Sequence, residues 1–550
     1  MEKLLRHGIA SGRKVLFSAK RLLFLTILLI WAITTVACNL GTTYVSALDL
    51  TATVSAQFDQ VSTTHPALAT NEPVALAEPT PNLAQPTTSN IELPETPLPT
   101  LLVEATPLPT ATRDNTPRPP ILYYTQSGDT LPVLAAHFGV GVDEIRAQGV
   151  VPDIGFITPG TLLIIPDYYG ADLASDPVLP DSEIIYSPSA LDFDISAYVM
   201  EANGYLSTYR EYIVDRWYSG AEVVELMAME ESINPRLLLG LLEYQSHWVY
   251  GQPENLAAET YPMGFIVQEK QGLRKQLSLA VQELSSGYYG WREGRIIEVF
   301  FPDGSQQRIY PKINAGSAAI QQFFSQFYDP ARWLGVLYGP ESFPVLYEEM
   351  FGSPWLRSQT VEPLFPTTLT QPVLELPFKV GKLWSFTGGP HPAWGPKGSW
   401  AAVDFAPGSD ESGCVTSNEW VTASAPGLVV RTGTGIVVVD LDGDGYEQTG
   451  WVIFYLHIAT KDKVKAGVYL EQDEEIGHPS CEGGSSTGTH VHIARKYNGE
   501  WITADGPVPF TLSGWVVGQG NKAYEGTLMR DGAIVTAHTY GSFETQIRRD

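Results

Sequence analysis

The sequence predicts a multidomain protein that combines a small βααβ module, a mainly α-helical middle domain and a C-terminal domain of antiparallel β-sheet. Its 550 residues exceed what one hydrophobic core normally supports. Apolar residues recur at helical spacing between 190 and 360, whereas from 371 onward short β-type runs alternate with Gly and turn residues. The 44% apolar residues indicate a largely globular chain. The formal net charge of −27 argues against nucleic acid as a partner, because nucleic-acid binding requires a basic patch.

Residues 1–38 have the pattern of an export signal. Lysines and arginines precede an apolar run at 22–37, which ends in small residues before Cys38. The letters TVAC at 35–38 resemble a lipoprotein signal, in which Cys38 becomes the lipidated first residue, although Thr35 replaces the usual leucine. An uncleaved anchor helix is the alternative. In both cases we expect the rest of the chain to be exported and held at the membrane, on the surface of the cell envelope.

A Pro/Thr-rich linker follows over residues 39–120, with the near-repeats ETPLPT (95–100) and ATPLPT (105–110). This composition buries too little apolar surface to fold, and proline keeps such a chain extended. We expect a disordered spacer that holds the following domains away from the membrane.

Residues 121–168 predict a module of strand, helix, helix and strand. Asp129 or Thr130, which follow Gly128, can cap the first helix, and PGTLLIIP (159–166) turns into the final strand. With GDTL at 128–131, these motifs resemble the LysM module over its whole length. The resemblance implies binding of N-acetylglucosamine-containing glycans such as peptidoglycan beside the helix-flanking loops, with Gly128, Asp129 and Thr130 as glycan-binding residues. The alternative is a spacer without a ligand.

Residues 185–360 predict a mainly helical domain, with a hairpin over 296–311. The stretch INPRLLLGLLEYQSHW (233–248) faintly resembles the catalytic-helix region of lysozyme-like lytic transglycosylases. The resemblance places the family's acidic glutamate at Gln245. An amide cannot deliver a proton to a glycosidic oxygen, and Glu243 points elsewhere on a helix. We therefore expect a degenerate lysozyme-like domain that binds glycan or acts as a spacer.

The domain at 371–550 carries a histidine pair. In HVH the residues His490 and His492 are two apart, so on a strand both imidazoles lie on one face. Together DFAPG (404–408), YLH (455–457) and GSSTGTHVH (484–492) resemble the M23, or lysostaphin-like, zinc peptidases. That family cleaves peptide bonds in peptidoglycan.

The first zinc ligand depends on which branch of the M23 family the loop follows. Most members place a histidine four residues before the aspartate, where this chain has Trp400. A LasA-like branch uses a longer loop, in which the histidine follows a Gly-Gly turn and precedes the aspartate by thirteen residues; GGPH puts His391 at that distance from Asp404. Trp400 then belongs to the inserted loop. The alternative is a site that has lost one ligand.

The resemblance implies one Zn2+ held by His391, Asp404 and His492, with the fourth position left for water. It implies that His490 is the general base and that His457 stabilises the oxyanion or shares the proton transfer; the sequence does not divide these two roles. The predicted function is a zinc metalloendopeptidase tethered to the cell envelope, which cuts peptide bonds of peptidoglycan while the LysM module binds the glycan. The alternative is a non-catalytic peptidoglycan-binding protein, or an activator of other wall hydrolases, with a vestigial M23 domain.

Two further features of the C-terminal domain lie outside the zinc motifs. DLDGDG (440–445) places Asp440, Asp442 and Asp444 at alternate positions, as at the start of a Ca2+ loop, but Trp451 stands where a bidentate glutamate is expected. A polar hairpin tip explains the motif equally well. If Cys38 carries lipid, Cys414 and Cys481 remain as a pair in an oxidising compartment, and we expect them to form a disulfide.

Overall fold

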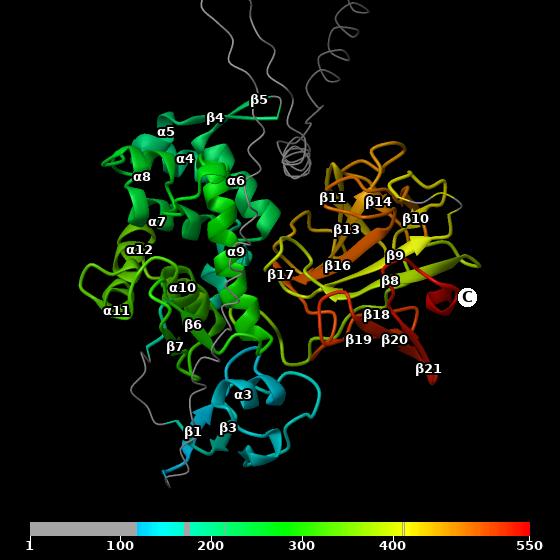
Figure 1. The fold of residues 1–550 in the computed structure, drawn as a ribbon, viewed down its shortest axis with the longest axis horizontal. Helices are drawn as coiled ribbons and strands as arrows, with labels where there is room; N and C mark the ends of the chain where they lie inside the picture. Colours follow the sequence, from blue (N-terminus) through cyan, green and yellow to red (C-terminus); the bar gives the residue numbers. More distant parts are fainter. Residues whose placement is uncertain (1–117, 170–175, 215, 410, 412) are drawn as a thin grey trace, which may run out of the picture.

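The computed structural model describes residues 118–550, apart from 170–175 and the single residues 215, 410 and 412. The predicted export signal, Cys38 and all but the last three residues of the predicted linker lie outside this range. Among the described residues, no helix combines the length and the apolar character needed to cross a bilayer. Figure 1 shows three parts: a small N-terminal module, a helical domain and a β domain.

The N-terminal module contains one α-helix, α3 (Leu131–Phe138). Its entry is set by the extended backbone of Thr130 and by a proline in the first turn, and its exit by Gly139 in the left-handed region at φ 63°. The strand β1 (Ile121–Tyr124) pairs antiparallel with β3 (Leu162–Ile165), so the first helix and the outer strands follow the prediction.

The prediction of a second α-helix in the module is wrong. A single 3₁₀ turn at Val142–Glu144 stands in its place and is followed by β2 (Arg146–Ala147), which pairs with β3. A segment of this length cannot offset the cost of nucleating an α-helix, whereas pairing with β3 satisfies its backbone groups. The module is therefore a three-stranded antiparallel sheet in the order β1-β3-β2 with one helix.

The middle domain is mainly helical, as predicted. Its helices are α4 (Ile195–Ala202), α5 (Tyr205–Thr208), α6 (Gly220–Glu231), α7 (Pro235–Ser246), α8 (Leu256–Thr260), α9 (Leu273–Arg292), α10 (Ala315–Ser325), α11 (Pro330–Tyr338), α12 (Phe343–Phe351) and α13 (Pro354–Ser358). Two hairpins join them: β4 (Arg210–Ile213) with β5 (Arg216–Ser219), and β6 (Glu298–Phe300) with β7 (Gln306–Arg308), the latter within the predicted range. The helix α9 runs along the side of the helical domain that faces the β domain (Figure 1).

The C-terminal domain is antiparallel β, as predicted. Its main sheet has the order β14-β11-β12-β13-β16-β9-β8-β22, with β17 on the side of β16, and a second sheet has the order β18-β19-β20-β21. The strands of the main sheet are β8 (Leu383–His391), β9 (Ala402–Pro407), β11 (Gly427–Gly433), β12 (Gly435–Asp440), β13 (Trp451–Ile458), β14 (Tyr469–Leu470), β16 (Val491–Tyr497), β17 (Glu500–Trp501) and β22 (Gln546–Arg548). The remaining strands are β10 (Val421–Thr422), β15 (Glu475–Gly477), β18 (Thr511–Leu512), β19 (Trp515–Gln519), β20 (Gly526–Arg530) and β21 (Ala533–Thr536).

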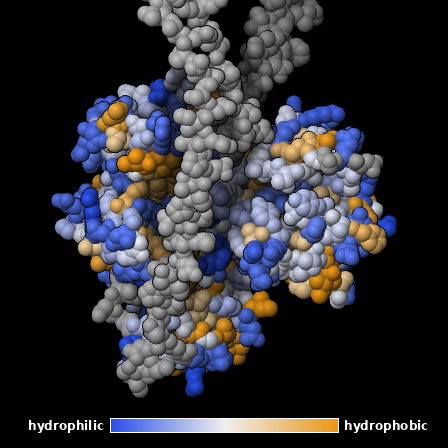
Figure 2. Space-filling view, viewed as in Figure 1, coloured by the Kyte–Doolittle hydropathy of each residue, from blue (hydrophilic) through white to orange (hydrophobic). Residues whose placement is uncertain are grey.

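The two faces of the main sheet belong to two different cores. Side chains alternate along a strand, so in β12 Val437 and Val439 face the core of the β domain, while Ile436 and Val438 face the helical domain. Phe454 and Ala494 continue the second face, and all are buried. The helical domain and the β domain therefore share one continuous hydrophobic core. On the face drawn in Figure 2, hydrophilic residues predominate over both domains and the apolar patches are scattered.

Arg292, at the end of α9, lies where the three parts of the protein meet. Its guanidinium donates to the carbonyl of Ser127 in the module (2.6 Å) and pairs with Asp181 (2.7 Å) and with Glu500 of the β domain (3.2 Å). Two anions and one carbonyl around a buried cation satisfy most of its donors, which is the condition for burying such a charge.

Candidate metal centre

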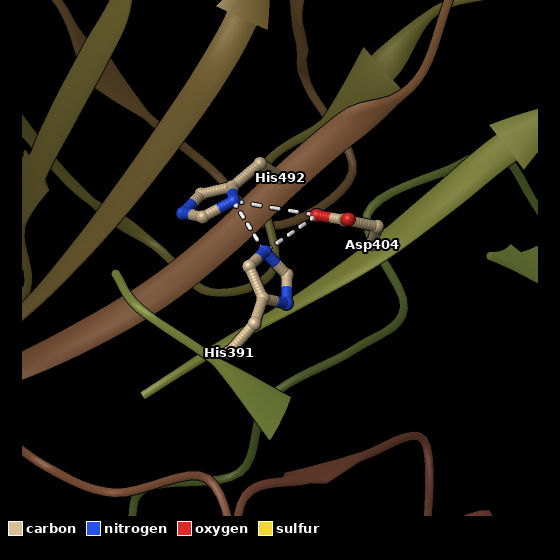
Figure 3. Close-up of side chains that lie close together, drawn as sticks. All are labelled: His391, Asp404 and His492. Carbon is tan, nitrogen blue, oxygen red and sulfur yellow. Dashed lines mark hydrogen bonds and ion pairs between the residues drawn. The ribbon is translucent and has the colours of Figure 1, made fainter. Parts of the chain in front are cut away.

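Three neighbouring strands bring His391, Asp404 and His492 together. His391 ends β8, Asp404 lies in β9, and His492 lies in β16, which borders β9 on its other side. Asp404 stands directly opposite His492 in the register, and hydrogen-bonded strands lie about 4.8 Å apart. The three side chains therefore converge from adjacent strands (Figure 3).

The donor atoms of these residues are close and buried. His391 Nε2 lies 3.0 Å from His492 Nδ1, and each of these nitrogens lies 3.3 Å from Asp404 Oδ1. At most 6% of each residue is exposed. Asp404 Oδ1 is buried and has no hydrogen-bond partner among the described residues.

Backbone carbonyls fix which nitrogen of each imidazole faces the centre. His391 Nδ1 lies 2.8 Å from the carbonyl of Gly389, and His492 Nε2 lies 3.0 Å from that of Ala393. A carbonyl only accepts hydrogen bonds, so each of these nitrogens carries the proton. The opposite nitrogens then direct their lone pairs at one another and at Asp404 Oδ1. Three converging lone pairs repel one another unless a cation lies between them.

Two more histidines border this set. His490 immediately precedes β16, and its Nε2 lies 3.7 Å from Asp404 Oδ1; His457, in β13, has its ring centroid 4.5 Å from that of His490. His490 Nδ1 donates to the carbonyl of Gly488 and His457 Nδ1 to that of Glu482, so Nε2 of both rings is free to accept a proton. The structure thus gathers all five residues that the sequence places at the zinc site.

Burial and mutual charge set the pKa values around Asp404. Burial acts to raise the pKa of Asp404, but the charges of His391 and His490 outweigh it and hold that pKa well below its usual range. Burial acts to lower the pKa of His391, yet the Asp404 carboxylate raises it. Burial, together with His490 and His492, lowers the pKa of His457 to about 3. The carboxylate is thus ionised and His457 is neutral near pH 7.

Gly388 and Gly389 lie within strand β8 rather than in the expected turn, and close packing requires both glycines. A Cβ at Gly388 would lie 2.4 Å from Asp404 Oδ2, and one at Gly389 would lie 2.5 Å from the backbone of Glu525. The second contact brings in the β19–β20 loop, where Tyr524 stacks on the His391 ring with 4.1 Å between centroids. Tyr524 is not predictable from the sequence, because it lies far beyond the motifs and no spacing links it to them.

The residues present fit a zinc ion. Two imidazole nitrogens and one carboxylate oxygen are the donor set of a catalytic zinc site that keeps one position open, and that oxygen, Asp404 Oδ1, has no hydrogen-bond partner in the part of the chain that the structure describes. Trp400 lies in the β8–β9 loop, outside this set, with the Arg295 guanidinium 5.3 Å from its ring.

The acidic residues of the predicted Ca2+ loop also lie together. Carboxylate oxygens of Asp440, Asp442 and Asp444 lie within 4.8 Å of one another at the turn after β12. Asp440 accepts hydrogen bonds from the backbone N–H groups of Asp442 and Gly445, which are the bonds of a polar turn. This geometry is shared by a hairpin tip and by the first half of a calcium loop.

The remaining predicted site residues are not among the donors of the metal centre. Cys414 and Cys481 form a disulfide, with their Cα atoms 5.5 Å apart. In the module, Asp129 accepts hydrogen bonds from Tyr123 and from the backbone of Gln126, and Thr130 is buried. Gly128 packs against Arg292, since a Cβ there would lie 1.8 Å from the guanidinium. The predicted glycan-binding loop therefore faces the helical domain.

Gln245, where the lysozyme-like resemblance places the family's acidic glutamate, lies near the end of α7. Gln245 lies near the hydroxyl of Tyr328, at 3.3 Å, and the carbonyl of Met263, at 3.4 Å. Glu243 accepts hydrogen bonds from the backbone N–H groups of Val249 and Tyr250, so it fastens the turn after α7.

Comparisons with known proteins point to peptidases. The family model described as LasA, N-terminal domain, matches residues 177–364, which is the helical domain. The chain is 26% identical over 362 residues to protease LasA of Pseudomonas aeruginosa, covering 62% of this chain and 79% of that protein. It is 27% identical over 162 residues to the beta-lytic metalloendopeptidase of Achromobacter lyticus, covering 28% of this chain and 40% of that protein.

Among solved structures, the chain resembles the M23 metalloprotease pseudoalterin from the deep sea, with 24% identity and a TM-score of 0.26, over 31% of this chain and 96% of that one. The sequence relatives, together with the converging metal-ligand set of His391, Asp404 and His492, support an M23-like metallopeptidase.

Proposed function

We propose that this protein is a zinc endopeptidase that hydrolyses peptide bonds of peptidoglycan at the cell-envelope surface. The observation that carries the proposal is the convergence of three lone pairs, from His391 Nε2, His492 Nδ1 and Asp404 Oδ1, at 3.0–3.3 Å in a buried site. Similarity to LasA and to the beta-lytic metalloendopeptidase supports peptidase chemistry. The M23 motifs DFAPG, YLH and GSSTGTHVH support peptidoglycan as the substrate.

Each residue of the site has one role in this proposal. His391, Asp404 and His492 hold the zinc, which supplies Lewis acidity to polarise the scissile carbonyl and to activate water. His490, with a free Nε2 at 3.7 Å from Asp404, accepts the proton of the attacking water and passes it to the leaving amine. His457 is neutral and its ring lies beside that of His490, with the planes tilted by 52°; its role is to donate a hydrogen bond to the developing oxyanion. The donor nitrogen is Nε2, so His457 would turn to the tautomer that carries its proton on Nε2 and give up its hydrogen bond to the carbonyl of Glu482.

In this proposal, the remaining parts of the chain hold the peptidase domain at the cell envelope and close to its substrate. Cys38 carries the lipid anchor and the Pro/Thr-rich segment is the spacer. The LysM-like module binds the glycan of the same polymer, which raises the effective concentration of the peptide at the metal site. A Ca2+ ion at Asp440, Asp442 and Asp444 would stiffen the β12–β13 turn.

The test is the zinc content of the purified full-length chain beside that of His391→Ala, together with release of free amino groups from peptidoglycan. We expect about one zinc per chain in the parent, as for a three-ligand catalytic site, and loss of both zinc and hydrolysis in the variant. A parent that binds no zinc after incubation with the metal would contradict the proposal and favour a wall-binding protein with a vestigial site. Retention of zinc by the variant would show that another residue is the third ligand.

A further inference from the structure

The loop that separates the first two metal ligands is held by the helical domain. Residues 392–401 join β8 to β9, between His391 and Asp404. Lys397 pairs with Glu283 of α9 at 2.5 Å, and the hydroxyl of Ser399 donates to Glu293 Oε1, just after α9, at 2.9 Å. The same carboxylate oxygen lies 3.3 Å from the backbone nitrogen of Trp400, which also donates to it.

An unbroken series of hydrogen bonds leads from Glu293 to a metal ligand. The hydroxyl of Ser399 donates to Glu293, the backbone N–H of Ala393 donates to the carbonyl of Ser399 at 2.9 Å, and His492 Nε2 donates to the carbonyl of Ala393 at 3.0 Å. The last bond fixes the tautomer of His492, as argued above. Outer partners of this kind orient a ligating histidine and raise its basicity.

The series is buried along its whole length. Ser399 is fully buried, Ala393 is 1% exposed, and the Glu293 side chain is 10% exposed. Arg295 Nε lies 2.5 Å from the other Glu293 oxygen, so the carboxylate is held from its far side as well. Hydrogen bonds in such surroundings are stronger than at the surface, and an unpaired member is costly.

We propose that Glu293 is a positioning residue of the metal centre, so that the helical domain supplies part of the outer shell of the site in the β domain. This inference rests on the proposed function, because it assumes that His492 ligates zinc. Glu293 does not touch the metal or the substrate. It acts through Ser399 and Ala393, by holding the loop whose carbonyl orients His492.

The proposal predicts a fall in metal affinity when the Ser399–Glu293 hydrogen bond is removed from either side. Substitution of outer partners of metal ligands typically lowers metal affinity about 10- to 100-fold. We expect a zinc dissociation constant higher by about that factor for Glu293→Ala and for Ser399→Ala. The double variant should lose no more than the worse single variant, because both changes break one series.

The experiment measures the zinc dissociation constant of the full-length chain by competition with a chelator, and the visible absorption spectrum of the Co2+-loaded protein. Glu293→Gln keeps an acceptor oxygen for Ser399 and should retain most of the affinity. Glu283→Gln is the matched control, because Glu283 binds the same loop through Lys397 but lies outside the series. Thermal unfolding of the metal-free variants shows whether the substitution merely unfolds the chain.

The outcomes separate this proposal from the proposed function. Reduced zinc affinity and an altered Co2+ spectrum in Glu293→Ala and Ser399→Ala, with Glu283→Gln unchanged, support the positioning role. Unchanged affinity in folded variants of a parent that binds zinc overturns it, and so does an equal loss in Glu283→Gln. Additive losses in the double variant also contradict a single series. A parent without zinc instead refutes the proposed function on which this inference rests.

Discussion

The Tyr524 ring lies nearly parallel to the His391 imidazole, with the planes 19° apart. Backbone hydrogen bonds join the same two segments, since the Gly389 N–H donates to the carbonyl of Tyr524 and the Tyr524 N–H donates to that of Pro390. The β19–β20 loop therefore holds the end of β8 just before the first metal ligand, and the stacked ring limits the rotation of that ligand.

Tyr524→Leu should weaken zinc binding, whereas Tyr524→Phe should leave it nearly unchanged. An aromatic pair contributes about 0.5–1.5 kcal/mol beyond its buried area, which corresponds to roughly a 2- to 10-fold change in the dissociation constant. Phenylalanine keeps the stacked ring and removes only the hydroxyl. Chelator competition measures both constants. Equal loss in the two variants would show that the hydroxyl, rather than the stack, matters for zinc.

His490→Ala should strongly reduce the rate of hydrolysis while the protein keeps its zinc. His490 Nε2 points at the site, but His391, Asp404 and His492 supply the three ligands, so the metal does not depend on it. Removal of a general base typically lowers the rate by about 10²- to 10⁴-fold. Zinc content and peptidoglycan hydrolysis are measured on the same sample, with His492→Ala as the control that loses both. Loss of zinc in His490→Ala would make His490 a ligand and require a new assignment.

Glu500→Gln should reduce the dependence of stability on pH. Burial, only partly offset by Arg292, raises the pKa of Glu500 from 4.5 to about 7, with Asp181 adding to the rise. Between these two pH values the folded protein binds more protons than the unfolded chain, so the free energy of unfolding falls as pH increases. The contribution is at most roughly 3 kcal/mol, because one pKa unit corresponds to about 1.4 kcal/mol. Thermal unfolding from about pH 5 to pH 7 measures it.

Glu447→Gln is the matched control for that measurement. Glu447 is also buried, but Arg431 and Lys496 outweigh the effect of burial and hold its pKa below 4.5. Its stabilising contribution is lost only as the pH falls through that lower pKa, which lies outside the range tested. The variant should therefore be less stable at every pH, with the slope of the parent. If Glu500→Gln also keeps the parent's slope, Glu500 does not titrate in this range.

The sequence predicts some residues of the metal centre and not others, because each residue is identified by a different kind of sequence signal. Strand alternation alone places His490 and His492 on one face, and both reach the site, but their roles come from the family resemblance. His391 depends on the family resemblance, since no physical rule links it to Asp404 across a loop. Tyr524 and Glu293 carry no motif and come from segments that only the tertiary fold brings near. The second helix of the module failed because a short segment with a nearby strand edge gains more from pairing than from one helical turn.

The loops on both sides of the module's helical region are covered by the rest of the chain. On one side Arg292 donates to the carbonyl of Ser127, beside the predicted glycan-binding residues. On the other side Phe156 stacks on Phe365, with the ring centroids 5.3 Å apart and the planes 10° apart. Under the proposed glycan binding, a glycan beside these loops would compete with these two contacts.

Phe365→Ser should increase the binding of the full-length chain to insoluble peptidoglycan. The substitution removes the ring on which Phe156 stacks, and an aromatic stack contributes about 0.5–1.5 kcal/mol, so the undocked module should become roughly 2- to 10-fold more populated. Phe365→Tyr keeps the ring and is the control. A sedimentation assay with peptidoglycan measures binding, and unchanged zinc content verifies that the β domain is intact. Equal binding by parent and variant would mean either that docking does not mask the loops or that the module binds no glycan. Adding Arg292→Ala to Phe365→Ser distinguishes these two explanations, because it also uncovers the Gly128 side of the module. If the module of this double variant still adds no binding to peptidoglycan, the module is a structural clamp between the domains.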